Sequence, residues 1–369
     1  MNSFLRFWQM FRHNISGTFD PWLLSTMLAI YTMSMFLLYS AESGDLNQIG
    51  NKAIHLLLSF LLLWMVARIQ PHILSRFALP LYAAAILLLI GVEVAGVTVN
   101  GSTRWLDFGI TRIQPSEIMK IALPMMVAAF FQKYESTLRW YHYILAVLII
   151  LLPVALILKQ PDLGTATLIM ASGLLVIFFA GLPWRAIFSA IGLFAATLPF
   201  MWHYGMHDYQ RKRVLMLLDP TQDPLGAGYH IIQSTIAIGS GGVLGKGWLN
   251  GSQSHLDYIP ESSTDFIFAV YGEEFGLVGN GLLLIAYLII VGRGLYIAST
   301  ATTLYTRTLA SALTMTIFCY AFVNMGMVSG ILPVVGVPLP LVSYGGTATI
   351  SIMMMLGLLM GISKQKHHH

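Results

Sequence analysis

Long runs of apolar residues, separated by short polar stretches, occupy most of the chain. Ten of these runs approach the ~20 residues that a helix needs to cross a bilayer. They cover residues 21–40, 52–68, 77–95, 115–132, 142–158, 164–180, 186–203, 264–292, 308–330 and 341–363. Only Gly181-Leu-Pro-Trp-Arg185 separates the sixth run from the seventh, which predicts a tight turn there. The pattern therefore predicts an all-α polytopic membrane protein with about ten transmembrane helices.

One long segment, at about 204–262, breaks this pattern. Pro- and Gly-rich turns surround residues 228–238, whose mixed apolar and polar positions predict a short amphipathic helix against the membrane. The glycines from Gly239 to Gly247 do not fit a phosphate-binding loop, because Gly247 replaces the Ser or Thr that should follow Lys246. We interpret these glycines as a source of flexibility.

The chain shows no internal repeat of fixed period, and its polar parts are too small to fold alone. We therefore predict a single membrane domain over residues 1–366, with His367–His369 as the remnant of an expression tag. Hydrophobic residues make up 56% of the sequence and charged residues only 10%, against about 25% in soluble domains. This excludes a soluble globular enzyme and a disordered chain. A net charge of +4 without an aromatic-basic motif gives no indication of nucleic-acid binding.

The distribution of charge predicts the orientation. With the N-terminus in the cytoplasm, the inner side holds eleven of the 20 Lys and Arg residues, as the positive-inside rule requires. They are Arg6, Arg12, Arg68, Arg76, Lys133, Arg139, Arg185, Arg293, Arg307, Lys364 and Lys366. Of the 16 acids, only Asp20 and Glu135 fall on this side. Both termini are therefore expected in the cytoplasm, and any chemistry is expected on the outer face.

Three predicted helices that run inwards from the outer face begin with an acid. Glu117 opens the fourth run, with Lys120 three residues later on the same helix face. Asp162 precedes the sixth run and Asp265 opens the eighth. Each acid alone could be an ordinary helix cap. If the three helix ends converge, they form an outward-facing polar pocket that suits a phosphate and offers a carboxylate base.

Three further features lie near this outer face. The basic cluster Arg211, Lys212 and Arg213 is either a solvated patch that contacts lipid headgroups or a site for a pyrophosphate-bearing lipid. The Pro-rich segment 330–346 is expected to fold into the active cavity rather than to form a simple turn. Glu273 and Glu274 are interpreted as buried acids satisfied by neighbouring helices.

Together these stretches resemble the SEDS family (shape, elongation, division and sporulation), whose members polymerise the glycan strands of peptidoglycan. The resemblance covers about residues 20–363 in family order. Its motifs are Arg104-Trp-Leu-Asp107, Gln114-Pro-Ser-Glu117, Gln160-Pro-Asp162-Leu-Gly-Thr165, Tyr209-Gln-Arg-Lys-Arg213, Asp223-Pro-Leu-Gly-Ala-Gly-Tyr229, Ala237-Ile-Gly-Ser-Gly-Gly242, Thr264-Asp265-Phe-Ile-Phe268, Glu273-Glu-Phe-Gly276 and Pro338-Leu-Pro-Leu-Val-Ser343-Tyr-Gly-Gly346. The short tails and the sequences that begin at Met206 and Gly326 favour an elongation-type member over a division or sporulation member.

The resemblance implies a peptidoglycan glycosyltransferase of the bacterial inner membrane that joins lipid II units on the outer face. It makes Asp265 the essential acid and places Glu117, Lys120 and Asp162 in the same cavity. A hydroxyl of the acceptor would attack C1 of the donor, and undecaprenyl pyrophosphate would leave. One base suffices because this leaving group is already a good one, and we predict that Asp265 is the base.

The positive charge for the pyrophosphate is expected from Lys120, from the 211–213 cluster, or from a divalent cation, Mg²⁺ or Mn²⁺, near Asp265. Arg104, Ser343 and Tyr344 are expected to contact substrate as well. The implied partners are an elongation-type class B penicillin-binding protein, other proteins of the elongation complex, and membrane lipids. Two alternatives stay open: Asp265 as a metal ligand, and a lipid II flippase in place of an enzyme.

Overall fold

The computed structural model describes residues 19–42, 44–99, 102–107, 109, 112–206, 208, 211, 214–215, 219, 227–255, 258–259 and 261–364. Ten helices correspond in order to the ten predicted runs. They are α2 (Pro21–Ala41), α3 (Leu46–Val66), α4 (Pro71–Ala95), α5 (Pro115–Lys133), α6 (Trp140–Lys159), α7 (Leu163–Phe179), α8 (Trp184–Phe200), α12 (Ile267–Ser299), α13 (Leu304–Val328) and α14 (Gly346–Ser363). The predicted all-α polytopic fold is therefore confirmed, and all ten predicted runs are helical in the predicted order.

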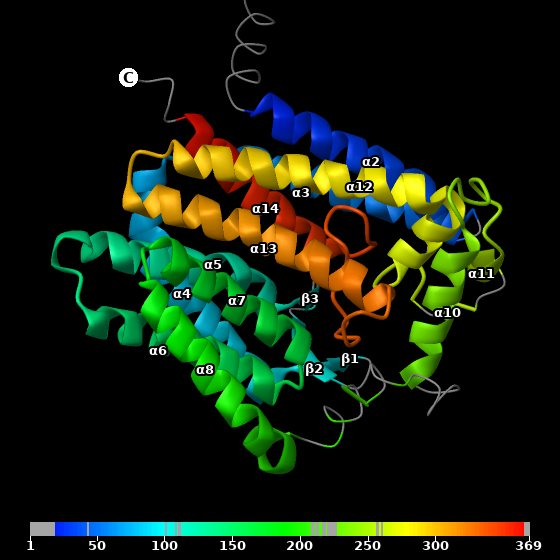
Figure 1. The fold of residues 1–369 in the computed structure, drawn as a ribbon. Helices are drawn as coiled ribbons and strands as arrows, with labels where there is room; N and C mark the ends of the chain where they lie inside the picture. The colour runs from blue at the N-terminus through cyan, green and yellow to red at the C-terminus, as the bar shows by residue number, and fades with distance from the viewer. Residues whose placement is uncertain are drawn as a thin grey trace, which may run out of the picture.

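Eight of the described helices are long and apolar enough to cross a membrane by themselves. The other two, α5 and α7, do not meet both conditions, α5 because of its charged residues and α7 because of its length. Glu117 and Lys120 lie in the first turns of α5, whereas α7 is apolar but has only 17 residues. Both helices pack inside the bundle, against α13 and against each other, so neither depends on lipid contact alone (Figure 1).

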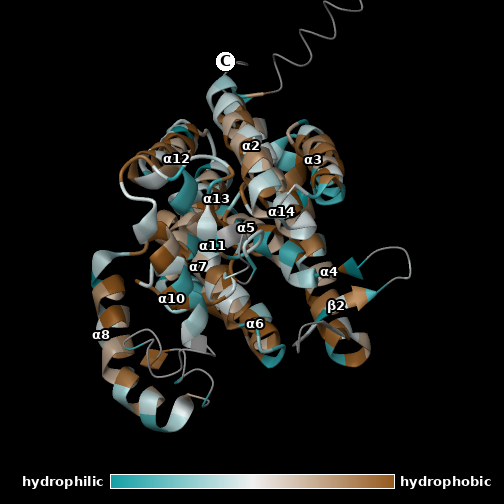
Figure 2. Ribbon diagram, turned by 90° about the vertical axis from the view of Figure 1, so that its right-hand side faces the viewer, coloured by the Kyte–Doolittle hydropathy of each residue, from teal (hydrophilic) through white to brown (hydrophobic). Residues whose placement is uncertain are grey.

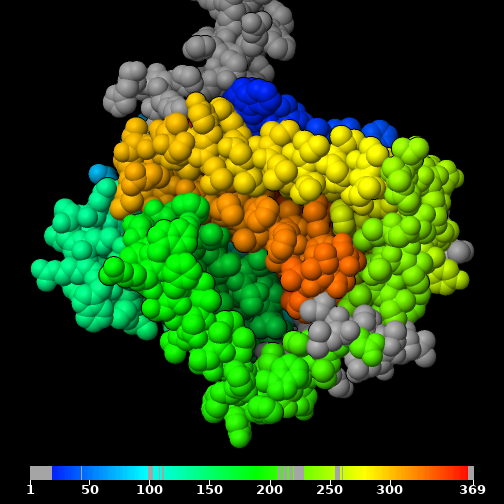
Figure 3. Space-filling view, viewed as in Figure 1, coloured from blue at the N-terminus to red at the C-terminus, as the bar shows by residue number. Residues whose placement is uncertain are grey.

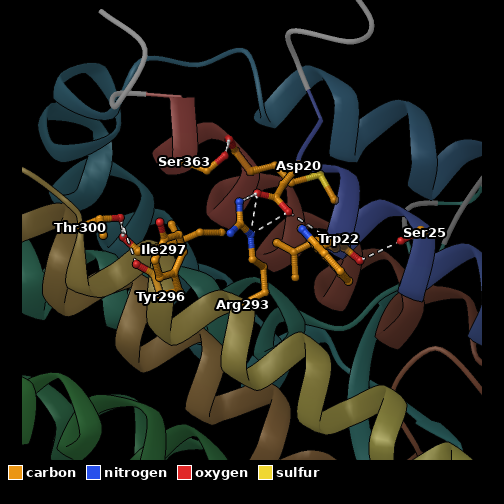
Figure 4. Close-up of polar contacts among 10 residues, drawn as sticks. Asp20, Trp22, Ser25, Arg293, Tyr296, Ile297, Thr300 and Ser363 are labelled. Carbon is orange, nitrogen blue, oxygen red and sulfur yellow. Dashed lines mark hydrogen bonds and ion pairs between the residues drawn. The ribbon is translucent and has the colours of Figure 1, made fainter. Parts of the chain in front are cut away.

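The helix ends follow local rules of capping. Asp20 caps α2 by accepting a hydrogen bond from Leu23 N, and Pro21 occupies the first helical position. The same carboxylate forms an ion pair with Arg293 of α12, in which Asp20 Oδ2 accepts hydrogen bonds from Nη2 at 2.7 Å and from Nε at 2.9 Å (Figure 4). This pair joins two helices that are adjacent in space but far apart in sequence.

The helix α12 is broken at Gly276, which adopts φ 62°. The segment from Gly242 to Gly247 runs alongside the break, and Leu277 N donates to Gly242 O at 3.0 Å while Lys246 N donates to Glu273 O at 3.0 Å. A Cβ on Gly245 would lie only 2.1 Å from Glu274 O, so these backbones can meet only through glycine. The interpretation of the 239–247 glycines as a source of flexibility was therefore wrong for Gly241 and Gly245, which permit close backbone packing against 272–274.

A small sheet and two short helices gather at one end of the bundle (Figure 1). The strands β1 (Val97–Val99), β2 (Ser102–Asp107) and β3 (Arg112–Ile113) pair antiparallel in that order. The helix predicted at 228–238 is found as α10 (Ala227–Ser240), which packs against α12, and the single turn α11 (Ser252–His255) follows it. The sheet was not predicted, because strands of two to six residues leave almost no periodic signal.

The helix α8 stands apart from the other helices, and none of its residues is buried. Figure 2 shows hydrophobic residues along much of the α8 ribbon, interrupted by paler positions. Figure 3 shows a hollow between α8 and the segment that follows α13, with α7 at its floor.

Candidate active site

Glu117 and Lys120 form a buried ion pair at the start of α5. Lys120 Nζ lies 2.7 Å from Glu117 Oε1, as the i, i+3 spacing predicts, and the two side chains are only 5% and 12% exposed. Ser351 of α14 donates a hydrogen bond of 2.6 Å to the other oxygen of Glu117. Because both oxygens are occupied, Glu117 is suited to hold Lys120 in place rather than to accept a proton.

The ammonium group of Lys120 lies over the ring of Tyr320 on α13, 4.8 Å from the ring centroid. Both side chains line a cavity of about 10 Å³, together with Ser343 and residues 338–341. Such a volume is room for about one water molecule. Lys120 therefore places positive charge beside the loop that follows α13.

Arg104 and Asp162 connect the small sheet to the start of α7. Arg104 Nη1 lies 3.3 Å from Asp162 Oδ2, and Arg104 Nη2 donates to Pro161 O at 3.2 Å. Asp162 also caps α7, because its Oδ1 accepts a hydrogen bond of 3.1 Å from Thr165 N. The capping interpretation of Asp162 is confirmed, and the carboxylate has a second partner in an arginine that becomes its neighbour only through the fold.

Asp265 lies in a turn over 261–266, two residues before α12 begins at Ile267. The expectation that Asp265 opens the eighth helix was therefore wrong by that margin: the chain is held in a turn by hydrogen bonds from the facing loop. A Cβ on Gly336 would lie 3.3 Å from Asp265 Oδ2, so the carboxylate packs directly against that loop.

The surroundings of Asp265 make it a stronger base than an ordinary aspartate. The pKa of Asp265 is raised to about 6, chiefly by burial and also by the charges of Glu261 and Asp162, while Arg104 acts in the opposite direction. A carboxyl group with this pKa is ionised at neutral pH and still accepts a proton readily. Since Arg104 and Asp162 both act on Asp265, the structure brings the sixth and eighth predicted helix starts together.

The loop between α13 and α14 holds the turn that carries Asp265. Ser343 Oγ donates to Thr264 O at 2.7 Å and accepts from Leu339 N at 2.7 Å. Tyr344 N donates to Ser263 O at 2.8 Å. The expectation that segment 330–346 folds into the site is confirmed. The Ser343 hydroxyl is used by two backbone partners, which gives it a structural role in the described site.

Two buried polar residues of this region were not predicted from the sequence. Asn324 of α13 donates from Nδ2 to Asp265 O at 2.8 Å and to Val337 O at 2.6 Å. Lys52 of α3 donates from Nζ to Val342 O at 2.7 Å and to Ser34 O at 3.3 Å. An amide and an ammonium group within apolar helices are costly unless partnered, and this was the available signal.

The remaining predicted residues lie outside this group or outside the described residues. Arg211 donates to His203 O at 2.9 Å and lies 3.9 Å from Asp208, whereas Lys212 and Arg213 are not among the described residues. Glu273 is fully buried and is bound by Lys246 Nζ at 2.6 Å and by Ser252 Oγ at 3.0 Å, and Ser40 donates to Glu274. The interpretation of Glu273 and Glu274 as satisfied buried acids is confirmed.

The described residues do not offer a ligand set for a protein-bound metal ion. No three His, Cys, Asp or Glu side chains among them lie close enough together to hold one. Of the acids that act on Asp265, Asp162 is paired with Arg104, and Glu261 lies at the start of the turn that carries Asp265. The site therefore presents one half-buried carboxylate, with the cations Lys120 and Arg104 on neighbouring elements.

Comparison with known proteins gives a consistent result over almost the whole sequence. The family model FtsW/RodA/SpoVE, described as cell cycle protein, matches residues 12–368. The chain is 50% identical over 343 residues to the peptidoglycan glycosyltransferase MrdB of Escherichia coli K12, and the match covers 93% of each protein.

Two solved structures share the fold. A chain from a peptidoglycan synthase complex, studied for its coordination of polymerization and crosslinking, aligns with TM-score 0.82 at 34% identity and covers 95% of this chain and 99% of that one. The rod shape determining protein RodA of Thermus thermophilus aligns with TM-score 0.72 at 29% identity, with the same coverage.

Proposed function

The chain belongs to the FtsW/RodA/SpoVE family of cell cycle proteins, and from this membership we propose that it is a multi-pass membrane peptidoglycan glycosyltransferase. Its substrate is lipid II, which it polymerises into glycan strands for elongation of the cell wall and for rod shape. The observation that carries this assignment is 50% identity to the MrdB glycosyltransferase over 93% of both chains.

The reaction requires one proton acceptor and stabilisation of a leaving diphosphate. The 4-hydroxyl of the acceptor sugar attacks C1 of the donor sugar, a β-1,4 glycosidic bond forms, and the bond between C1 and the pyrophosphate oxygen breaks. The hydroxyl proton passes to the Asp265 carboxylate, and undecaprenyl pyrophosphate leaves with the bonding electrons. The pKa of about 6 suits Asp265 to this role, because it is ionised at pH 7 without being a weak base.

Lys120 and Arg104 supply the positive charge. Each is held by a carboxylate, Glu117 or Asp162, whose geometry keeps the cation in place before substrate binds. Preorganised cations of this kind stabilise developing negative charge without reorganisation during the reaction. A Mg²⁺ or Mn²⁺ ion bound to the pyrophosphate would add positive charge beside these two side chains.

The location of the site follows from charge. The outer elements α10, α11 and β1–β3 surround the helix starts that carry Asp162 and Asp265, at the end of the bundle opposite the basic inner loops. The positive-inside rule supports an active site on the outer side of the bacterial inner membrane. A class B penicillin-binding protein of the elongation type is the proposed partner, because the structural neighbour comes from a complex that couples polymerization to crosslinking.

Polymerisation of lipid II by the purified full-length chain tests this function. The native chain with its transpeptidase partner should form glycan strands, and Asp265→Ala should abolish product while the protein remains folded in the membrane. Full activity of Asp265→Ala would contradict the role of the base. Transport of lipid II between leaflets without polymer, even with the partner present, would instead establish a flippase.

A further inference from the structure

One buried amide connects the two segments that form the reactive centre. Asn324 lies on α13 with 0% of its surface exposed, and its Nδ2 group donates to Asp265 O at 2.8 Å and to Val337 O at 2.6 Å. An amide nitrogen has two hydrogens, so these two bonds use its full donor capacity. One side chain therefore connects the turn that carries Asp265 to the loop that faces it.

The orientation of this amide is fixed by its partners. Both are backbone carbonyl oxygens, which accept hydrogen bonds and cannot donate them, so only the nitrogen end of the amide can face them. The other end, Oδ1, accepts no hydrogen bond from any described residue. A buried acceptor without a partner is costly. The favourable hydrogen bonds of this side chain are therefore the two that its Nδ2 group donates.

The two bonds control the position of the Asp265 carboxylate. Val337 directly follows Gly336, the residue whose Cβ would lie 3.3 Å from Asp265 Oδ2. Asn324 thus sets the distance between the Asp265 backbone and the loop backbone against which the Asp265 side chain rests. A change in that distance would move the carboxylate relative to any sugar hydroxyl in the site.

The same face of α13 also contacts the cationic part of the site. Tyr320 lies four residues before Asn324, one helical turn away on the same face. Lys120 Nζ lies 4.8 Å from the Tyr320 ring centroid. One rigid helix therefore fixes the spacing between the group that accepts the proton and the cation beside the diphosphate.

We propose that Asn324 is a positioning residue of the glycosyl transfer, which acts by holding Asp265 at the correct place against the 336–344 loop. This inference rests on the proposed function, since it concerns the base of that reaction. Asn324 itself has no contact with the reacting atoms. Its loss should slow the chemical step and leave lipid II binding intact, because Lys120 and Arg104 keep their own partners.

The test compares Asn324→Leu, Asn324→Ser and the native chain in steady-state polymerisation of lipid II with the partner present. Asn324→Leu removes both donors and keeps the number and branching of the side-chain heavy atoms. We expect kcat to fall about 10- to 100-fold, as for a misplaced catalytic group, with KM changed less than about twofold. Asn324→Ser keeps one hydroxyl donor and adds no charge, so kcat should lie between those of the leucine variant and the native chain. Activity of the native chain tests the function itself, and the ratio between variants tests the positioning role.

Asn280→Leu provides the matched control. Asn280 lies on the adjacent helix α12, and its Oδ1 is likewise buried without a described partner, but it makes no described contact with the Asp265 turn. We expect native kcat and KM from this variant. Native kcat in folded Asn324→Leu would overturn the proposal, and so would equal losses in Asn280→Leu. If Asn324→Leu does not fold, native kcat in Asn324→Ser overturns it.

Discussion

Arg104 Nη1 lies 3.3 Å from Asp162 Oδ2, so an arginine from the small outer sheet is held at the start of a membrane helix. The pair also acts on a third residue: the pKa of Asp265 is raised to about 6, chiefly by burial, and in this total Arg104 lowers the pKa while Asp162 raises it. The protonation of the proposed base is therefore coupled to a contact between two elements that do not contain it.

The first prediction concerns Arg104→Gln and pH. In the native chain, kcat/KM should rise with pH through about 6 as Asp265 ionises. Removal of the Arg104 cation removes the interaction that lowers this pKa, so the rise should move to higher pH. The rate at pH 7 should also fall at least about tenfold, because the leaving diphosphate loses a cation.

Measurement of polymer formation from pH 5 to 8 checks both parts. Arg112→Gln is the control, because Arg112 lies in the same sheet but pairs with Asp107, at 3.2 Å. A midpoint that moves to lower pH in Arg104→Gln would contradict the sign of the coupling. An identical shift in Arg112→Gln would show a general surface effect instead.

The second prediction concerns Lys120→Met. The variant removes the cation of a pair whose side chains are 5% and 12% exposed, and it leaves Glu117 charged with only Ser351 as partner. Loss of one partner of a buried pair typically costs about 3–5 kcal/mol of stability. We expect a lower thermal midpoint and a loss of polymerisation of at least about 100-fold per folded molecule.

Lys246→Met separates these two effects. Lys246 Nζ lies 2.6 Å from the fully buried Glu273, so the variant breaks a comparable pair beside the break in α12 and away from Asp265. Its thermal midpoint should fall, while its activity per folded molecule should stay close to native. Equal loss of specific activity in both variants would mean that Lys120 acts through stability alone.

The parts of the site that could be predicted from the sequence are those set by neighbouring residues. The Glu117–Lys120 pair follows from helical spacing, and the capping role of Asp162 follows from its place before an apolar run. The position of Asp265 was harder to predict, because the hydrogen bond that holds Thr264 in the turn comes from Ser343, 79 residues away. The break at Gly276 likewise depends on residues 242–247, which no local pattern connects to it.

The third prediction concerns divalent cations. Because no three potential ligands lie together among the described residues, Mg²⁺ should bind the protein measurably only when lipid II is present. Calorimetric titration of the purified chain with MgCl₂, with and without lipid II, checks this. Binding at micromolar Mg²⁺ without lipid II would contradict the prediction. If that binding were lost in Asp265→Asn, Asp265 would be a metal ligand.

The last prediction concerns Gly336→Ala. Gly336 has φ +69°, where an L-residue costs about 1–2 kcal/mol, and the added Cβ would lie 3.3 Å from Asp265 Oδ2. The methyl group should push the carboxylate away from the loop by a few tenths of an ångström and lower kcat about tenfold, with little change in KM. Gly181→Ala is the control, because Gly181 has φ +101° but nothing within 4 Å of its Cβ position. It carries the same kind of backbone cost far from the site and should retain native kcat. Native kcat in Gly336→Ala would show that the contact between Gly336 and Asp265 does not set the position of the base.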